Sequence, residues 1–452
     1  MKSRFRFILF LFPVAIAAEA HEPSPAPSSS SRRSLPWVRA EDVPLPVGAA
    51  GVFIRLPDQP ASPQQGPAVY TAPGDLTRRR GTLLFGETFP LFAAVSGPNC
   101  SGRWLSIAPH AWTCSDHTEL TKNEAWSTPS SAALPYRYYF AAAEGARGYD
   151  TPELVGEGVP SQEFEKGFGV GIVDEKRLND RKVVRTAYGR WIDTRELVPA
   201  NPSRFHGEAA PKAESKETHA KKIGWFREAR TLTLKGTKTF YAKRQAVLIG
   251  RSEGSAKNMK FEIEDVGGKD ANVKDPNGKE LSVKQALANP TWVPASWLAI
   301  PSDAPMPTLL AADERWVDVD LATQILTAFE GNTPVFYTLV STGRGGAPEL
   351  STPVGEHRVW AKLLSTKMDN LEDVEHAYSL EDVPYVQFFS KGVALHGAFW
   401  HDDFGKKRSH GCVNLSPEDA RHLFEWSSPH LPKGMSAVLP TSSEPGLLVR
   451  VR

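Results

Sequence analysis

The stretch that surrounds Cys412 constrains the fold of this 452-residue chain more than any other. Two apolar runs, Val383–Phe389 and Gly392–Leu395, predict strands that lead into His396. A short polar segment separates His396 from Cys412, and the sequence after Ser416 is typical of a helix start. We therefore expect Cys412 on a loop between strands and a capped helix, where a rigid scaffold holds a reactive residue.

Cys412 has the neighbours of a cysteine nucleophile. It ends the run Ser409–His410–Gly411–Cys412, in which Gly411 leaves room for a substrate carbonyl beside the sulfur. The nucleophile of cysteine chemistry is the thiolate, and a nearby imidazole is the usual means of making one at neutral pH. His396 offers that base. Backbone amides around Gly411 and Cys412 are expected to receive a developing oxyanion.

The N-terminus predicts an exported protein. Residues 1–20 combine a basic start, an apolar run and small-residue cleavage positions, as secretory signal peptides do. A buried helix or a membrane anchor is the weaker alternative, because a bilayer span needs about 20 apolar residues. We expect no membrane span after signal cleavage, and a location in the periplasm or cell wall.

Cysteine usage agrees with an oxidising compartment. The chain has three cysteines, and two of them, Cys100 and Cys114, lie close together in sequence. We expect these two to form a disulfide, with two free buried thiols as the alternative. Cys412 then has no partner, and an odd thiol in an exported protein is a candidate for reactivity.

Composition limits the domain count and the classes of partner. A chain of 452 residues is too long for one hydrophobic core, so several domains are expected. The 53 basic and 52 acidic side chains nearly cancel, leaving a net charge of +1. That balance gives no support to nucleic-acid binding.

Turn residues and short apolar runs divide the chain into mainly β regions. Residues 21–36 form a Pro/Ser linker. Residues 50–125 and 145–200 alternate short strands with turns, as small β-barrels do, although generic β sequence is the alternative. Residues 209–222 are a charged linker or loop. Residues 225–301 have a β-like pattern and stay unassigned, either as a third module or as an extension of the C-terminal domain.

Residues 50–125 resemble a bacterial SH3-like domain, a module common in wall-associated proteins. The resemblance is carried by VYTAPG, GTLLFGE and GRWLSIAPHAWTC, in that order along the chain. Residues 145–200 look like a degenerate repeat of the same module. The resemblance implies recognition of a wall polymer or of a partner protein.

Residues 313–440 resemble the L,D-transpeptidase catalytic domain of bacterial cell-wall enzymes. HGAFWHDDFGKKRSHGCVNLSPEDA, which begins at His396, matches the family signature almost throughout. STPVGEHRV and VPYVQFF also fit family segments in the expected order. Two positions depart from the family: Ala398 stands where threonine is common, and Tyr385 stands where tryptophan is common. These two departures put the contacts to substrate in doubt.

The resemblance implies a mainly β fold: an L,D-transpeptidase β-sandwich catalytic domain at the C-terminus, preceded by small SH3-like β-barrel modules. It implies that Cys412 is the nucleophile, that His396 is the base, and that the backbone carbonyl of Gly397 orients the His396 ring. Backbone amides near His410, Gly411 and Cys412 look like the oxyanion hole. The residues implied to shape the pocket and bind substrate are Ser409, His410, Gly411, Asn414 and Trp400.

The implied reaction is two-step acyl transfer by a cysteine acyltransferase, in peptidoglycan synthesis, cell-wall biogenesis and cell shape. The sulfur attacks the L,D bond between the third and fourth residues of a tetrapeptide stem and expels D-alanine. The acceptor stays open: a diaminopimelate amine of another stem gives a 3-3 cross-link, a protein amine gives attachment of a wall-anchored protein, and water gives L,D-carboxypeptidase activity. The resemblance implies acylation by carbapenems, and neither a cofactor nor a metal.

Three other assignments have less support. A zinc site built from His396, His401, His410 and Cys412 has no compact ligand pair, and His401 is expected instead to be a surface or pocket-rim histidine. In a papain-like peptidase the cysteine precedes the histidine, the reverse of the order here. A wall-binding scaffold with a weakly active enzyme domain is the alternative from another class, but the presence of both His396 and Cys412 does not favour it.

Overall fold

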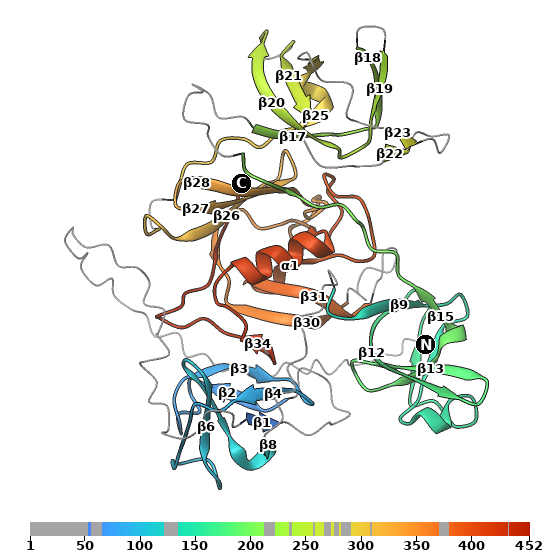
Figure 1. The fold of residues 1–452 in the computed structure, drawn as a ribbon, viewed down its shortest axis with the longest axis vertical. Coiled ribbons are helices and arrows are strands. Elements are labelled where there is room, and N and C mark those ends of the chain that lie inside the picture. Colours follow the sequence, from blue (N-terminus) through green and yellow to red (C-terminus); the bar gives the residue numbers. More distant parts are fainter. Residues whose placement is uncertain are drawn as a thin grey trace, which may run out of the picture. The chain divides into compact units, whose positions relative to one another are not determined.

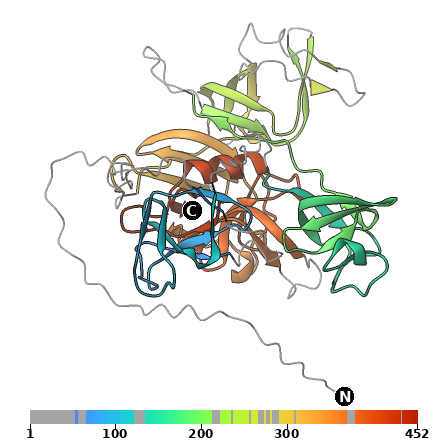
Figure 2. The same ribbon diagram turned by 60° about the horizontal axis from the view of Figure 1, so that its bottom comes forward.

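The structure, a computed structural model, is drawn in Figures 1 and 2. It describes residues 53–55, 66–121, 134–211, 222–234, 237–255, 258–265, 273–274, 280–281, 291–307, 310–369, 379–432 and 434–452. The predicted signal peptide and the Pro/Ser linker lie outside these residues. Within them the fold is mostly β, as predicted, and no described helix has the length and apolar character that a membrane crossing requires.

The C-terminal region begins with a six-stranded sheet. Three of its strands form an antiparallel meander. In sheet order the strands are β16 (Glu208–Ala209), β28 (Thr333–Leu339), β27 (Ile325–Glu330), β26 (Arg315–Asp320), β35 (Leu448–Val451) and β29 (Gly355–Arg358).

Strand β35 lies beyond the domain boundary that the sequence predicts at residue 440. It pairs in parallel with β26 and antiparallel with β29, in the interior of the sheet. Buried Asp318 on β26 accepts hydrogen bonds from two guanidinium groups, Arg450 Nε at 2.7 Å and Arg452 Nε at 3.0 Å. A parallel pairing between distant segments leaves no local pattern, so the sequence did not reveal it.

A second group of strands carries the Cys412 stretch. In order across the sheet these are β33 (Val413–Leu415), β32 (Val393–Gly397), β31 (Ser379–Ser390), β30 (Ala361–Asp369) and β34 (Met435–Val438). Helix α1 (Pro417–Trp426) follows β33 at once. Its cap is the predicted one, because the Ser416 hydroxyl accepts a hydrogen bond from the Asp419 amide at 3.3 Å.

Helix α1 covers one face of these strands, as both views show for the red helix against the orange strands. Leu423 and Phe424 on the helix share one buried core with Leu395, Val413 and Leu415. Side chains alternate across a strand, so the residues between these point to the opposite face. The side chains of His396 on β32 and of Asn414 on β33 therefore lie on that opposite face. So does the side chain of Cys412, which directly precedes β33.

The first upstream region has its own core, to which the C-terminal region adds buried Met435 and partly buried Leu431. Strand β34 also pairs with β3 in this region. Its SH3-like architecture remains a prediction. The strands are β1 (Phe53–Arg55), β2 (Ala68–Tyr70), β3 (Arg79–Leu83), β4 (Thr88–Pro90), β5 (Ala93–Val95), β6 (Trp104–Ala108), β7 (Ala111–Cys114) and β8 (Glu119–Thr121).

Cys100 and Cys114 are joined by a disulfide in this region. We expect the double variant Cys100→Ser/Cys114→Ser to lose roughly 3 kcal/mol of unfolding free energy in this region, the chain-entropy value for a loop of about 15 residues. Denaturant unfolding with and without reductant measures the loss. Non-reducing peptide mapping supplies the control: recovery of Cys412 in the major disulfide would contradict the pairing.

The second upstream region packs on the face of β31 that α1 does not cover. Tyr138 donates a hydrogen bond from its hydroxyl to the Asp382 carbonyl at 2.7 Å, and its ring lies 4.1 Å from that of Phe399. The strands are β9 (Arg137–Ala141), β10 (Ala146–Gly148), β11 (Gln162–Phe164), β12 (Gly169–Leu178), β13 (Arg181–Thr186), β14 (Trp191–Asp193) and β15 (Leu197–Pro199).

The described strands of the unassigned region 225–301 include an antiparallel five-stranded sheet, and Trp225 and Ala299 of this sheet share a buried core with Tyr337 and Leu339 of the C-terminal region. In sheet order its strands are β24 (Thr291–Pro294), β21 (Lys260–Asp265), β20 (Ala246–Glu253), β17 (Lys222–Phe226) and β25 (Leu298–Ala299). Short hairpins pair β18 (Arg230–Leu234) with β19 (Thr237–Tyr241), and β22 (Val273–Lys274) with β23 (Glu280–Leu281).

The predicted charged linker at residues 209–222 is described only at its two ends. Its first residue belongs to strand β16, which pairs with β28, and its last begins strand β17. Residues 212–221 lie outside the described part of the chain. The chain therefore enters the six-stranded sheet just before this segment.

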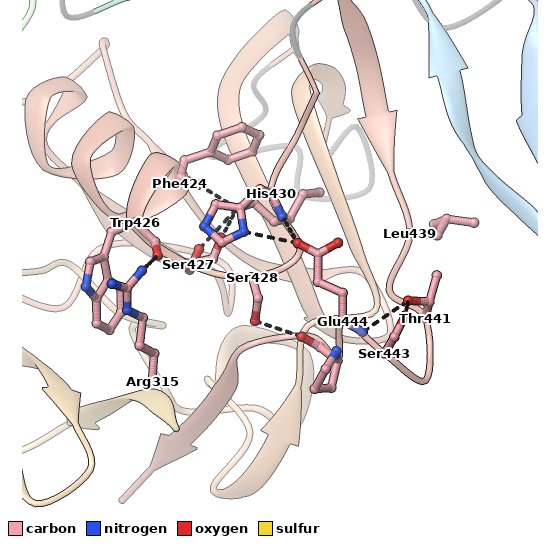
Figure 3. A network of polar contacts seen from close by, with 12 residues as sticks. Arg315, Phe424, Trp426, Ser427, Ser428, His430, Leu439, Thr441, Ser443 and Glu444 are labelled. Carbon is pink, nitrogen blue, oxygen red and sulfur yellow. Dashed lines mark hydrogen bonds and ion pairs between the residues drawn. The ribbon is translucent and has the colours of Figure 1, made fainter. Parts of the chain in front are cut away.

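Polar contacts hold the end of α1, and Figure 3 labels Arg315, Phe424, Trp426 and Ser427 among the residues that make them. Arg315 donates to the Trp426 carbonyl at 2.7 Å. Lys362, fully buried on β30, donates from Nζ to the Phe424 carbonyl, and to the Ser427 carbonyl at 2.7 Å. A cation at this position satisfies carbonyls that the helix leaves unpaired at its C-terminus.

Replacing Lys362 with methionine should therefore destabilise the protein strongly. Each buried acceptor left without a donor costs about 1–3 kcal/mol, and at least two carbonyls lose their partner. Urea unfolding measures the change in unfolding free energy. Lys407→Met, at an exposed position, is the control and should change little. Equal stability of the two variants would show that the ammonium does not hold the helix end.

Candidate active site

Strand register brings Cys412 and His396 to the same place. Strands β32 and β33 are parallel, with Leu395 paired to Val413 and His396 paired to Asn414. Cys412 therefore lies beside Ala394, and His396 lies two positions further along on the same face. From the strand spacings, the Cα atoms of Cys412 and His396 are roughly 8 Å apart. That separation lets the two side chains reach each other.

The Cys412 sulfur is desolvated, although the residue as a whole is partly exposed. Its Sγ lies 3.9 Å from the Gly392 carbonyl oxygen. Burial raises the pKa of the thiol to about 11, and the Ala394 amide only partly offsets this by hydrogen bonding to the sulfur. The resting group at neutral pH is therefore a thiol, and attack requires a base to take its proton.

His396 has the properties of that base. Its side chain is 3% exposed, and Nδ1 lies 3.1 Å from the Gly397 carbonyl oxygen. Because a carbonyl only accepts, Nδ1 carries the proton and Nε2 keeps a free lone pair. Burial lowers the pKa of His396 to about 4, so the ring is neutral at pH 7. The Trp400 ring lies 5.7 Å from the His396 ring in a stacked arrangement.

The turn before Cys412 is held by Ser409. Its hydroxyl donates to the Cys412 carbonyl and accepts from the Gly411 amide at 3.1 Å. Gly411 has φ +124°, and a Cβ there would lie 3.3 Å from the Ser351 carbonyl oxygen. Both features favour glycine at this position. Ser409 and Gly411 therefore shape the turn that presents the sulfur.

Thr352 supports this turn from the neighbouring loop, and sequence reasoning missed it. Its buried hydroxyl donates to the Gly411 carbonyl at 2.7 Å and accepts from the Gly343 amide at 2.9 Å. Thr352 belongs to STPVGEHRV, a segment quoted above only for its place in the family order. Nothing local in that segment indicates a contact with a residue almost sixty positions away.

His410 turns out to face an arginine that the sequence did not single out. Arg344 Nη2 lies 2.8 Å from His410 Nε2. A guanidinium only donates, so Nε2 is the acceptor and the proton of the neutral ring resides on Nδ1. His410 is thus positioned by the loop after β28. In the sequence signature His396 comes first, and His410 lies two residues before Cys412.

Of the two positions expected for His401, the structure excludes the surface. His401 is 9% exposed, and its Nε2 lies 3.0 Å from the amide group of Asn414. Burial, followed by the nearby Arg408, lowers the pKa of His401 to about 4. His401 is therefore a neutral, buried histidine next to a predicted substrate-binding residue.

The described residues offer little to a metal ion at this site. The one cluster of three possible ligands among them is Cys100, Cys114 and Asp116. Two of these side chains are joined by the disulfide, which removes their thiolates as ligands. His396, His401, His410 and Cys412 do not form such a cluster in the described part of the chain.

A comparison with protein families identifies the domain that carries this site. The family model of the L,D-transpeptidase catalytic domain (YkuD) matches residues 314–439. Residues 314–439 are an L,D-transpeptidase catalytic domain. The resemblance inferred from the Cys412 signature is thereby confirmed for these residues. L,D-transpeptidase catalytic domains are of the cysteine acyltransferase type.

Solved structures similar to the transpeptidase domain come from several bacteria. They include an L,D-transpeptidase of Xylanimonas cellulosilytica, with 24% identity over 32% of this chain and 64% of that chain, at a TM-score of 0.23. An L,D-transpeptidase of Stackebrandtia nassauensis has 28% identity over 31% and 57%, at 0.22. L,D-transpeptidase 3 of Mycobacterium tuberculosis, in complex with a faropenem-derived adduct, has 23% identity over 30% and 60%, at 0.25.

Each alignment covers about a third of this chain and less than two thirds of the solved chain. No curated protein matches the chain. The assignment therefore rests on the family model and on the residues of the site.

Proposed function

We propose that this chain is an exported peptidoglycan L,D-transpeptidase in which Cys412 is the nucleophile and His396 the base. The observation that supports this most is the His396 ring. It is buried and neutral, and Nδ1 is held by the Gly397 carbonyl, so Nε2 is available on the face that also carries Cys412. A thiol with a raised pKa needs a base of this kind.

In the first step the proton of the Cys412 thiol passes to His396 Nε2 as the sulfur attacks a carbonyl carbon. The carbonyl belongs to the third residue of a tetrapeptide stem, and the bond that breaks joins it to the nitrogen of the D-alanine in position four. His396 then gives its proton to that nitrogen, and D-alanine leaves. The products are a thioester on Cys412 and a neutral His396, ready for the second step.

The carbonyl oxygen of the stem gains negative charge during attack and needs hydrogen-bond donors. The sequence pointed to the amides near His410, Gly411 and Cys412. Because the Gly411 amide already donates to Ser409, the amide of Cys412 is the better placed donor next to the sulfur. We propose it as the principal oxyanion donor.

The second step transfers the acyl group from sulfur to an acceptor. His396 takes a proton from the entering amine, and the thiolate leaves and is reprotonated. The acceptor is an amine of another stem, an amine of a protein to be attached to the wall, or water. Intact mass spectrometry of products from purified disaccharide-tetrapeptide separates cross-linking from hydrolysis. If no D-alanine is released and no thioester forms, the proposed function is wrong.

Wall polymer is the proposed target of the upstream modules, and export is proposed from the N-terminal sequence. Residues 50–125 and 145–200 would hold the enzyme on peptidoglycan through their SH3-like character. The mature full-length chain is therefore expected to sediment with insoluble sacculi. Failure of the full chain to bind sacculi would remove the wall-targeting role.

From the sequence alone, a fragment that begins near Pro301 should still form the acyl-enzyme. The structure supports the opposite prediction. Such a fragment loses strand β16, the Gly207 amide that donates to buried Asp419 at 2.8 Å, and the Tyr138 ring that packs on Phe399. Phe399 in turn contacts Trp400, the neighbour of His396.

We therefore expect the Pro301 fragment to be destabilised and to react with carbapenem at least about 10-fold more slowly, since small displacements in an active site cost this much or more. A fragment that begins at Leu134 keeps all three contacts and is the comparison. Thermal unfolding and the rate of acyl-enzyme formation are the measurements. Equal rates in the two fragments would show that the upstream modules serve binding alone.

A further inference from the structure

His401 and Asn414 form a buried pair beside the nucleophile. The amide of Asn414 lies 3.0 Å from His401 Nε2, and the two side chains are 4% and 9% exposed. Asn414 is the strand partner of His396, so its side chain lies on the face that His396 and Cys412 share. The backbone of Asn414 is held on its other side by Ser341, through two hydrogen bonds of 2.9 Å.

The other nitrogen of His401 decides the direction of the bond to Asn414. The Asp403 amide donates to His401 Nδ1 at 3.2 Å, so Nδ1 is an acceptor. The loop that supplies this amide is itself fixed, because Ser341 donates from its hydroxyl to the Asp403 carbonyl at 3.0 Å. A neutral imidazole has one donor and one acceptor, so its proton must be on Nε2.

The structure places Asn414 Nδ2 opposite Nε2, but a protonated Nε2 can only donate, so we exchange the two amide positions and assign the facing atom as the Asn414 oxygen. Amide oxygen and nitrogen are assigned from the hydrogen-bond network in this way, since the two positions are nearly equivalent in shape. The NH₂ group then takes the other position. Its two N–H donors are then directed away from His401.

We propose that His401 is a positioning residue, which holds Asn414 with its amide oxygen turned away from substrate and its NH₂ group on the His396–Cys412 face. There the NH₂ group donates to a carbonyl oxygen of the acyl donor. Without the His401 donor the amide is free to rotate and to present its oxygen, which repels a carbonyl. This inference rests on the proposed function and adds the residue that selects the donor orientation.

One substitution of Asn414 and three of His401 test the proposal in the full mature chain. Asn414→Ala and His401→Phe should each lower kcat/KM for acylation about 10- to 100-fold, the value of one hydrogen bond to a reacting substrate. The loss should appear in kcat more than in KM if the bond strengthens as charge develops. His401→Gln places an N–H donor near the position of Nε2 and should retain activity within about 3-fold of wild type, whereas His401→Asn, which is too short, should not.

The double variant gives the decisive readout. If His401 acts only through Asn414, His401→Phe/Asn414→Ala should be no slower than Asn414→Ala alone. The proposal would be overturned if the fold-loss in kcat/KM of the double variant equalled the product of the two single losses. Equal losses in His401→Gln and His401→Phe would also overturn it. His117→Gln, an exposed histidine in the first module, is the matched control. Thermal unfolding shows whether each variant is folded. If His401→Phe is not folded, the comparison of His401→Gln with His401→Asn decides whether His401 acts as the donor to Asn414.

The substrate used in the assay separates this proposal from the proposed function. Acylation of Cys412 by a carbapenem, followed by intact mass spectrometry, requires the site but not recognition of a stem peptide. Coupling between His401 and Asn414 seen with the carbapenem supports the positioning role even if the wild-type chain fails to release D-alanine from a tetrapeptide. Release of D-alanine without coupling between the two residues leaves the function standing and rejects the positioning role.

Discussion

Cys412→Ala and Cys412→Ser are expected to abolish both D-alanine release and covalent labelling by carbapenem. The Cys412 thiol lies on the same face of the strands as the neutral base His396. No other described thiol is free. A serine hydroxyl is a far weaker nucleophile without further activation, so the isosteric change is expected to be as severe as the truncation. Loss of mass increase on incubation with carbapenem measures the first effect, and a D-alanine assay measures the second.

The double variant Cys100→Ser/Cys114→Ser is the matched control for this prediction. Both cysteines are in a disulfide of the first module, remote in sequence from the site. Labelling by carbapenem should persist at full stoichiometry in this variant under conditions where it is folded. Turnover by Cys412→Ala at the wild-type rate would refute the mechanism, whatever the control shows.

His396→Ala is expected to lower the rate of acylation about 10²- to 10⁴-fold, the usual contribution of a general base. The wild-type pH profile should carry the signature of this residue. Because burial lowers the pKa of His396 to about 4, the ring is neutral above that value, and kcat/KM should decline only as pH falls through about 4. His396→Ala should lose this acidic limb, since the titrating group is gone. Stopped-flow acylation with carbapenem measures both.

His410→Ala separates the two histidines of the signature. His410 Nε2 accepts from Arg344, so this nitrogen is not available to take the proton of the Cys412 thiol. We expect His410→Ala to retain more activity than His396→Ala and to keep the acidic limb of the pH profile. If His410→Ala were inactive and His396→Ala active, the two roles would have to be exchanged.

Much of the site could be predicted from local sequence. The cap at Ser416 and the two strands that lead into His396 follow from patterns that span a few residues, and the structure contains them. The pairing of Cys412 with His396 as nucleophile and base was inferred from residue types and from the family signature. Strand register then put both on one face, which alternation along β32 and β33 requires once Leu395 and Val413 face the core.

The supporting residues could not be predicted in the same way. Thr352, Arg344 and the Asp403 amide each contact the site through a hydrogen bond to a residue that is distant in sequence or on another loop. A threonine or arginine in a turn carries no mark of such a partner. His401 was misjudged for the same reason, because its burial depends on loops that meet only in the folded chain.

The sequence by itself determined the reactive chemistry, because a nucleophile, its base and a helix cap are specified by residue type and short spacing. Tertiary structure decided how that chemistry is held. The parallel pairing of β35 with β26, the burial of Lys362 at the end of α1 and the packing of Tyr138 on Phe399 join segments that are far apart along the chain. Such contacts form only when the backbone is folded, since their stabilisation comes from desolvation and geometry that no local pattern encodes.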